Sequence, residues 1–549
     1  MKMKMKRIGA LLLTGSTLLG MTSCIGSGGT KLETDDGDKR PAIYVSVFNG
    51  GYGREWIDTI VSDYNKEHPE NSYKIAVRSS KDEFNTVLNN LQAGTAPYDM
   101  FYTNAYAYKL INARVLEDIT DVWETKPDGS DRTIHEMMVG SENYAKAYSD
   151  AAGKLYAVPL QESLRGFVYD HEMFLKYGLL FNEAGGFITS PTETLSKGKD
   201  GIQGTYDDGH PITETQWAAM ANKATAAFGY AFNYTGKFSS YLNDVFEMIT
   251  AQYDGIDKYM LNWTFDGTYD FGDGRGEQTI TLEKGYELTK MQGNAKALEF
   301  MDTYLACKDT KLNITNKYTY PSASTNSYSH TDAQNDFISF TAQNKKTKMA
   351  MLIEGDWWEN EAKTMFNALE AEKITDYAFR KHDYRFMTLP YFDGQAENVN
   401  VYTIAENMYM GLKKQTDEEK KAICKDFMVY SYQPKYIQNF TVVSGGVMPY
   451  DVELTPDQKA KLSPFVNNFL SIYRDHEHNK FINPMLYMNM YDTGRGNMVT
   501  RTSNGEHYVV INGLYYYSAA DYMSKLYNNQ AKNWDSKLIA YNTYLNNKA

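Results

Sequence analysis

Segments with strand and helix patterns alternate between residues 42 and 103, and this alternation narrows the folds that the chain can adopt. The strand segments are rich in β-branched and aromatic residues, and the helix segments carry apolar residues on one face. Along the chain they are a strand over 42–48, a helix over 54–68, a strand over 73–77, a helix over 81–93 and a strand over 98–103. Strands that alternate with helices in this way form right-handed βαβ units on a parallel sheet. The pattern therefore predicts an α/β fold.

Polar and aromatic residues stand at the ends of the first and third of these strands. Asn49 and Tyr52 follow the first strand, and Tyr102 and Asn104 lie at the end of the third. Ligands of open parallel sheets lie beyond the carboxyl ends of the strands. We therefore expect these four residues to contact a ligand.

A stretch in the middle of the chain, residues 346–360, predicts a second part of a binding site. Residues 349–353 are an apolar run typical of a buried strand, and the chain then turns through Gly355 and Asp356 to Trp357 and Trp358. Indole faces stack on the C–H faces of sugar rings, and carboxylates accept hydrogen bonds from hydroxyl groups. A core position is an equal alternative for Trp358, whereas the turn directly before Trp357 favours a site.

The amino terminus has the pattern of a bacterial export signal. Four cations among residues 2–7 precede an apolar region over 8–21 that is too short to span a bilayer. The small residues directly before Cys24 resemble a lipobox, which implies cleavage before Cys24 and lipidation of its thiol. An ordinary export signal with an incidental cysteine is the alternative. Residues 25–39 are rich in Gly, Ser, Thr and charge, which is typical of a flexible tether.

Length and charge limit the remaining possibilities. The 549 residues allow two to four domains, and the net charge of −13 argues against nucleic acid, which requires a basic surface. No later run of 18 or more apolar residues predicts a membrane span. The other cysteines, Cys307 and Cys424, stand among apolar residues in helical patterns, so we expect buried free thiols.

Residues 156–163 predict a crossing between two lobes. This extended stretch contains Pro159 and a polar middle of Gln161, Glu162 and Ser163. A strand that passes between lobes exposes such a polar middle to the cleft. Three other segments add candidate positions: Tyr234 after a strand over 229–233, Trp263 in a polar aromatic loop over 262–276, and Gly445 in a glycine-containing loop over 442–449.

Aspartates separated by glycines over 199–209 raise the question of a calcium ion. Oxygen ligands from Asp200, Asp207 and Asp208 could surround Ca²⁺, although their spacing does not fit an EF-hand. A tight turn that binds nothing is the alternative.

Four motifs in a fixed order give the chain a resemblance to a known family. They are APYDMFY at 96–102 with LEDI at 116–119, KLYAVP at 154–159 with Tyr169-Asp170, KMAMLIEGDW at 348–357 and SGGVMP at 444–449. Over residues 41–450 the chain resembles bacterial extracellular solute-binding proteins of ABC importers, in the carbohydrate branch that includes maltose-binding protein. The resemblance implies a type II periplasmic-binding-protein-like fold, with two lobes of mainly parallel sheet flanked by helices and joined by hinge crossings.

The resemblance also implies a domain division and roles for single residues. We expect a signal peptide at 1–23, a lipidated cysteine and tether at 24–40, lobe 1 at 41–157 plus about 399–445, and lobe 2 at about 158–398 plus 446–549. Tyr102 and Trp357 fall at sugar-stacking positions, Asn104 at a hydroxyl-binding position and Glu162 at a ligand carboxylate position. With these, the expected ligand-binding residues are Asn49, Tyr52, Tyr234, Trp263, Asp356, Trp358 and Gly445.

The implied function is capture of an oligosaccharide between the lobes and its delivery to a membrane permease. The expected partners are the oligosaccharide, the ABC permease subunits and the membrane through a lipid anchor on the outer side of the cell; nucleic acid is not among them. We expect a monomer that needs no cofactor and has no catalytic residues. A binder of peptides or other polar solutes and a surface glycan-binding lipoprotein remain alternatives. So does a glycoside-active enzyme that uses two of Glu162, Glu354 and Asp356 as a carboxylate pair.

Overall fold

The computed structural model describes residues 37–80, 84–104, 106–306, 317–396, 398–487 and 519–548. The predicted signal, the lipidation site at Cys24, most of the tether and Cys307 lie outside the described residues. Cys424 is a buried free thiol, as predicted. No helix in the described part of the chain is long and apolar enough to cross a membrane.

Lobe 1 begins with the strand and helix series that the sequence predicts. Strands β1 (Ala42–Phe48), β2 (Lys74–Ser80) and β3 (Met100–Thr103) form a parallel sheet in the order β2-β1-β3. Helix α1 (Glu55–Glu67) buries its apolar face, and α2 (Phe84–Gln92) precedes β3. Shorter helices complete the lobe: α3 (Ala107–Asn112), α4 (Thr120–Trp123), α5 (Ile134–Met137) and α6 (Ser141–Tyr148).

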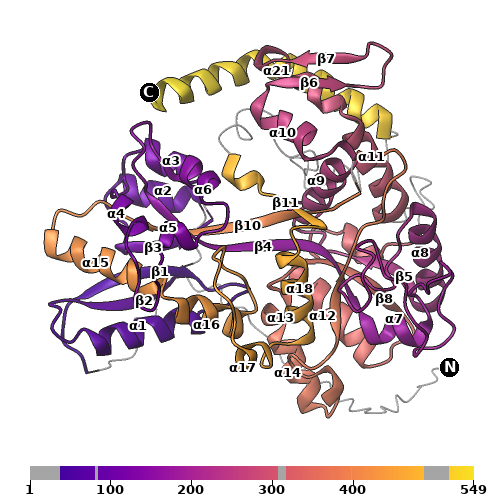
Figure 1. Ribbon diagram of the computed structural model, residues 1–549, viewed down its shortest axis with the longest axis horizontal. Coiled ribbons are helices and arrows are strands. Elements are labelled where there is room, and N and C mark those ends of the chain that lie inside the picture. The colour runs from indigo at the N-terminus through magenta and orange to yellow at the C-terminus, as the bar shows by residue number, and fades with distance from the viewer. Residues whose placement is uncertain are drawn as a thin grey trace, which may run out of the picture.

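Two long antiparallel strands run through both lobes and join them. β4 (Ala157–Asp170) and β10 (Asn400–Leu412) lie side by side across the middle of the molecule in Figure 1. Their far ends pair with different lobes, because β10 pairs with β3 while β4 pairs with β8 (Lys348–Gly355). The lobes therefore share one sheet in the order β2-β1-β3-β10-β4-β8-β5, in which β5 spans Gly229–Asn233, and the crossing predicted at 156–163 is the first half of β4.

Lobe 2 is built around β8, which is buried along its whole length. β5 (Gly229–Asn233) pairs with it in parallel, and β9 (Tyr384–Met387) pairs with β4. Its helices are α7 (His171–Tyr177), α8 (Glu214–Phe228), α12 (His330–Ala342), α13 (Trp358–Glu361) and α14 (Lys363–Ala371), with short 3-10 turns η3 (Pro321–Ser324) and η4 (Thr375–Tyr377). The Thr213 side chain caps α8 in a capping box with Gln216.

The chain after β10 returns to each lobe in turn. α15 (Glu418–Ser431) packs on α4, and α16 (Pro434–Ser444) packs on α1 of lobe 1. After α17 (Pro456–Lys459), α18 (Pro464–Arg474) packs on β9 of lobe 2. β11 (Asn479–Ile482) then pairs with β10 and leads to a short turn, η5 (Pro484–Tyr487).

A third unit stands above the hinge strands in Figure 1 and has an apolar cluster of its own. It contains α9 (Ser240–Asp254), α10 (Ile256–Thr264), the hairpin β6 (Gly267–Asp270) with β7 (Glu277–Ile280), η1 (Leu282–Lys290), α11 (Gln292–Phe300), η2 (Met301–Leu305) and α21 (Ala519–Lys548). The prediction of a loop over 262–276 is wrong, because this stretch forms the end of α10 and most of the hairpin. Its aromatic side chains, Tyr269 among them, are buried in the cluster and hold this structure in place.

Candidate functional site

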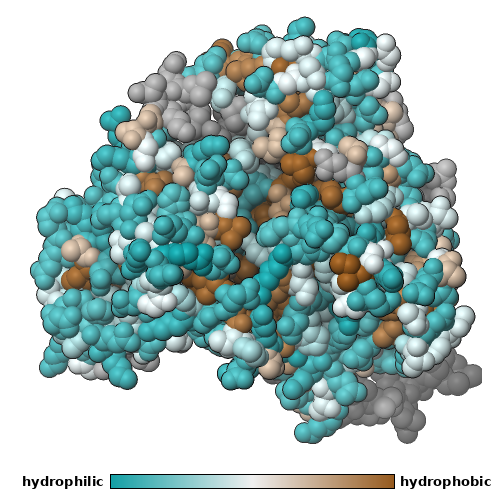
Figure 2. All heavy atoms as spheres, in the orientation of Figure 1, coloured by the Kyte–Doolittle hydropathy of each residue, from teal (hydrophilic) through white to brown (hydrophobic). Residues whose placement is uncertain are grey.

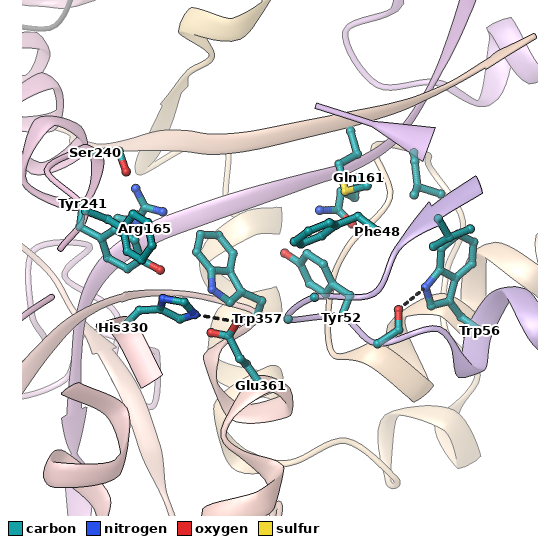
Figure 3. A pocket seen from close by; sticks show the side chains of 17 residues that line it. Phe48, Tyr52, Trp56, Gln161, Arg165, Ser240, Tyr241, His330, Trp357 and Glu361 are labelled. Atoms are coloured by element: carbon teal, nitrogen blue, oxygen red, sulfur yellow. Dashed lines mark hydrogen bonds and ion pairs between the residues drawn. The ribbon is translucent and has the colours of Figure 1, made fainter. Parts of the chain in front are cut away.

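The loops that follow β1 and β8 meet beside the hinge strands and enclose a cavity of about 290 Å³. Figure 2 shows the molecule hollowed near its centre on the viewed face, with apolar surface gathered along the hollow. The cavity walls come from both lobes, from β4 and from the start of α9, as Figure 3 shows in close view. The cavity thus lies where the carboxyl ends of strands in the two lobes approach each other.

Aromatic rings make up much of the cavity wall. Trp357 lies between Tyr52 of lobe 1 and Tyr241 of α9, with ring centroids 6.4 Å from each and nearly perpendicular planes. The three side chains are only 5–9% exposed, so most of each ring is covered by protein. The backbone of Gly51 packs directly on the indole, since a Cβ there would lie 2.7 Å from a Trp357 ring carbon. Only glycine permits this approach.

Two hydrogen bonds in or beside this cavity join the lobes directly. The Tyr52 hydroxyl donates to Oδ2 of Asp356 at 2.8 Å and lies 2.6 Å from the Ser163 hydroxyl on β4. Asn360 Nδ2 donates to the Gly51 carbonyl at 2.7 Å. The described conformation is therefore one in which the two lobes are in contact around the cavity.

Arg165 brings a cation to the cavity wall. It lies on β4, two residues from Ser163, so both side chains point to the same face of the strand. Its guanidinium lies 3.8 Å from the centroid of the Tyr241 ring and 5.1 Å from that of Trp357, and it forms an ion pair with Asp244 of α9. At 3% exposure the guanidinium is held in a nearly dry setting by an aromatic face and a carboxylate.

A second ion pair lies below Trp357 in Figure 3. His330 Nε2 is 3.2 Å from Oε1 of Glu361. Gln334 bridges Oε2 of Glu361, at 2.7 Å, to Oε1 of Glu354, at 3.0 Å. Burial disfavours the charged imidazole, but the bond to Glu361 and its charge outweigh burial and raise the pKa of His330. Burial first, and then the Glu361 charge, raise the pKa of Glu354 well above its ordinary value.

A polar mouth adjoins the aromatic cavity. It has a volume of about 400 Å³ and shares Tyr52 and Glu361 with the inner cavity. Its other walls include Asn49, Arg54, Asn360 and Lys363. Asn49, Tyr52 and Trp357, three of the residues proposed from the sequence, therefore border these two neighbouring spaces, and Asp356 is bonded to the wall of the inner one.

Other residues proposed from the sequence lie elsewhere. Tyr102 is buried against Trp56 with ring centroids 5.2 Å apart. Trp358 is fully buried in the lobe 2 core, with its ring centroid 5.0 Å from that of Tyr384.

Three further residues do not line the cavity either. Tyr234 is buried and donates to the Leu305 carbonyl at 2.6 Å, and Trp263 packs in the third unit. Gly445 ends α16 with φ of 80°. Asn104 is exposed and borders neither the cavity nor its mouth.

Glu162 sits at a different junction of the hinge. Because it is one residue away from Gln161 and Ser163, its side chain leaves the opposite face of β4. Its carboxylate accepts from the hydroxyls of Tyr144 and Tyr473, the latter at 2.6 Å, and from Asn483 at 3.2 Å. Neither Glu162 nor Glu354 lines the cavity, so this space is not flanked by the carboxylate pair that the enzyme alternative requires.

One carboxylate oxygen of each aspartate in residues 198–209 accepts from an amide of the same loop. Asp207 accepts from the Lys199 amide at 2.7 Å, Asp208 from the Gly204 amide at 2.7 Å, and Asp200 from the Ile202 amide at 2.7 Å. In the described part of the chain no group of three or more His, Cys, Asp or Glu could hold a metal ion. These hydrogen bonds close a tight turn, and a titration with Ca²⁺ tests whether an ion also binds here.

Arg165, Tyr241, His330 and Glu361 line the cavity but were not proposed from the sequence. Arg165 could have been found, because alternate residues of a strand share a face and Gln161, Ser163 and Arg165 follow that spacing. No local pattern marks the other three, which belong to helices whose packing brings them to the cavity.

Comparison with known proteins agrees with the resemblance drawn from the motifs. Residues 50–263 match the family model of bacterial extracellular solute-binding proteins. That family consists of binding proteins rather than enzymes. No curated protein matches the chain.

Solved structures of similar fold cover most of the chain at low identity. A chitin oligosaccharide binding protein is 13% identical, with a TM-score of 0.55 over 91% of this chain and 100% of its own. Maltose-bound MalE3 of T. maritima is 14% identical, with a TM-score of 0.53 over 89% and 98%. The Thermus thermophilus maltotriose binding protein, bound with maltotriose, is 12% identical, with a TM-score of 0.50 over 89% and 99%. These likenesses establish the two-lobed α/β fold of solute-binding proteins.

Proposed function

We propose that this chain, which matches extracellular solute-binding proteins over residues 50–263, captures a saccharide between its two lobes for an ABC importer. The observation that carries the proposal is the cavity in which the largely buried Tyr52, Tyr241 and Trp357 stand beside hydrogen-bonding groups of both lobes. Solved structures of the same fold include proteins described as binding chitin oligosaccharide, maltose and maltotriose.

The chemistry of the cavity suits a sugar better than an apolar solute. Aromatic faces cover the C–H faces of a pyranose ring, while Gln161, Arg165 and Glu361 offer donors and acceptors to its hydroxyls. A purely apolar ligand would leave these buried polar groups without partners, which costs free energy. Selectivity for a polyhydroxylated ring follows from this combination.

The space favours more than one sugar unit. The inner cavity of about 290 Å³ is at the lower end of the range for small-molecule pockets, and the polar mouth adds about 400 Å³. An oligosaccharide would place one unit among the aromatic rings and extend towards Asn49 and Lys363. Hinge motion about β4 and β10 would open and close this space.

Delivery to a permease and attachment to a membrane complete the proposal. The lipobox-like residues before Cys24 support lipidation of that thiol, and the matched family supports a position outside the cytoplasm. A lipid anchor would keep the binding lobes near permease subunits, and the closed form would be the one that the permease recognises.

The test is a ligand screen with the purified protein. Melting temperature and tryptophan fluorescence are measured against oligosaccharides of maltose, chitin, xylan, galactan and cellulose type and against a peptide library. A ligand that binds the folded form raises the melting temperature by mass action. Trp357→Ala should weaken the saccharide found by roughly 30-fold or more, as for a buried aromatic contact, whereas Trp358→Phe should not.

Three results would contradict parts of the proposal. Peptide binding without sugar binding would assign the chain to another class of solute. Shortened oligosaccharides after incubation would identify an enzyme. Unchanged affinity in Trp357→Ala would move the site away from the β8 loop.

A further inference from the structure

The charged side chains that line the inner cavity all have partners of opposite charge. Among the described residues that line it, Arg165, His330 and Glu361 are the charged ones. His330 and Glu361 pair with each other, and Arg165 pairs with Asp244, which stands behind it on α9. The wall of the cavity therefore contains charged groups, but the opposite charges within each pair nearly cancel.

A single helix face holds Arg165. Tyr241 and Asp244 are three residues apart on α9 and so share one side of the helix. The Tyr241 ring covers one face of the guanidinium, and its centroid lies 3.8 Å from the guanidinium carbon. The Asp244 carboxylate accepts a hydrogen bond from the NH1 group of Arg165. The Asp244 carbonyl in turn accepts from the Thr403 hydroxyl of β10 at 3.0 Å, which fixes this part of α9 to the hinge.

We propose that Asp244 is a specificity-determining residue that neutralises Arg165 and thereby restricts the cavity to uncharged sugars. The inference rests on the proposed function and narrows its ligand class. An acidic sugar, such as a uronate, would compete with Asp244 for Arg165 and would face the carboxylates of Glu361 and Asp356. A cationic amino sugar would face the guanidinium of Arg165. An uncharged sugar can accept bonds from Arg165 without displacing Asp244.

The experiment uses matched sugar pairs, each with one neutral and one uronate member. The pairs are galactobiose with digalacturonate, cellobiose with glucuronyl-glucose, and xylotriose with glucuronate-substituted xylotriose. Calorimetry gives the dissociation constant of each member for the wild type and for Asp244→Asn, which keeps the shape of the side chain and removes its charge. The wild type should bind the neutral member of the preferred pair at least tenfold more tightly. Asp244→Asn should reduce that ratio roughly tenfold, because close charge pairs couple at least this strongly.

Two controls separate this role from a general effect of charge or folding. Asp451→Asn removes a surface carboxylate that pairs with Arg132 and should leave the ratio unchanged. In the double variant Asp244→Asn with Arg165→Gln, the gain for the uronate should disappear, because the released cation is gone. If Asp244→Asn does not fold, the wild-type ratio over the matched pairs decides alone.

The outcomes distinguish this inference from the proposed function. A wild type that binds uronates as tightly as neutral sugars, or more tightly, overturns the inference and leaves saccharide binding in place. So does a folded Asp244→Asn with an unchanged ratio. A protein that binds neither member of any pair and none of the screened saccharides removes the proposed function and this inference with it.

Discussion

Two segments of the molecule carry clustered carboxylates whose hydrogen-bond partners differ. The first, residues 354–361, runs from the end of β8 through α13 and is here called the cleft loop. The second, residues 198–209, is here called the insert loop. In the cleft loop, Asp356 accepts from Tyr52, which is 304 residues away, and Glu359 accepts from Ser463, which is 104 residues away. In the insert loop, Asp207 and Asp208 accept from backbone amides at most eight residues away. The same residue types thus join distant elements in one loop and fold the other loop onto itself.

This difference separates a loop that positions the candidate site from a loop whose hydrogen bonds stabilise only its own turn. Carboxylates bonded to side chains of other elements fix those elements relative to one another, and in the cleft loop these elements are the two lobes and α12. Carboxylates bonded to amides of their own loop replace the hydrogen bonds that a turn lacks. We therefore expect changes in the cleft loop to alter ligand affinity, and changes in the insert loop to alter stability alone.

The largest effects are expected from two matched glycine substitutions. Gly198 of the insert loop has φ of 60°, and a Cβ there would lie 2.3 Å from the Asp207 carboxyl carbon. Gly198→Ala should lower the free energy of unfolding by about 4 kcal/mol, since overpacking and a left-handed backbone both add cost. Gly51→Ala should instead displace Trp357 and weaken ligand binding at least tenfold. Denaturant unfolding and calorimetry measure the two quantities, and a Gly198→Ala protein with weakened binding would break the comparison.

The pH dependence of stability should distinguish the two loops next. Burial raises the pKa of Glu359 from 4.5 to about 7, against the Ser463 bond and the Arg380 charge. The folded state thus holds this proton more tightly than the unfolded state. Stability from this group is intact below about 4.5 and falls by about 3 kcal/mol as the pH rises to 7. Glu359→Gln should remove that fall, as measured by urea unfolding at pH 4 to 8.

Asp207 provides the matched control for this titration. Burial raises its pKa from 3.8 to about 6, so its contribution should be lost between about pH 4 and 6. Asp207→Asn should flatten the stability profile in that lower window and leave the part between pH 6 and 7 unchanged. If Glu359→Gln and Asp207→Asn flattened the stability profile over the same pH range, burial would raise the two pKa values equally.

The sequence predicted the fold well because its signals are local. The βαβ alternation of residues 42–103 and the apolar run of β8 depend on neighbouring residues, and both elements form as expected. Trp357 and Trp358 show where such reasoning ends. They are adjacent and equally apolar, yet one lines the cavity and the other is enclosed by Phe337, Tyr384 and Phe465. The start of α13 between them decides which way each ring points, and no neighbouring residue reveals that turn.

The rest of the candidate site depends on packing between segments far apart in the chain. Tyr241 and His330 reach the cavity because α9 packs on β10 and α12 packs on β8, and neither residue follows a strand end. Tyr102 was expected at the ligand because it lies near the end of β3, but its side chain is buried beside Trp56. A strand end predicts where a ligand lies, but the alternation of side chains decides which residues contact it.

A smaller effect is expected from Tyr52→Phe, which removes one hydroxyl that joins the lobes. The change leaves Asp356 and Ser163 without this partner and should weaken ligand binding roughly fivefold, equivalent to about 1 kcal/mol for one hydrogen bond. Tyr234→Phe is the matched control, because its buried hydroxyl donates to the Leu305 carbonyl in the core, away from the cavity. It should cost similar stability without a change in affinity. Equal affinity losses in both variants would show that the Tyr52 hydroxyl has no specific role between the lobes.

The smallest effect is expected from Ca²⁺ at the insert loop, which should leave the melting temperature unchanged. A Ca²⁺ ion needs six to eight oxygen ligands, whereas one oxygen of each of Asp200, Asp207 and Asp208 already accepts from an amide of the loop. Millimolar Ca²⁺ or a chelator should therefore leave the melting temperature of the ligand-free protein unchanged, whereas a bound ion would raise it by mass action. Gly198→Ala gives a second reading, because it disturbs the loop without removing a carboxylate. A melting temperature that rises with Ca²⁺ in the wild type and not in Asp207→Asn would place an ion among these aspartates. The insert loop would then resemble the cleft loop in binding something beyond itself.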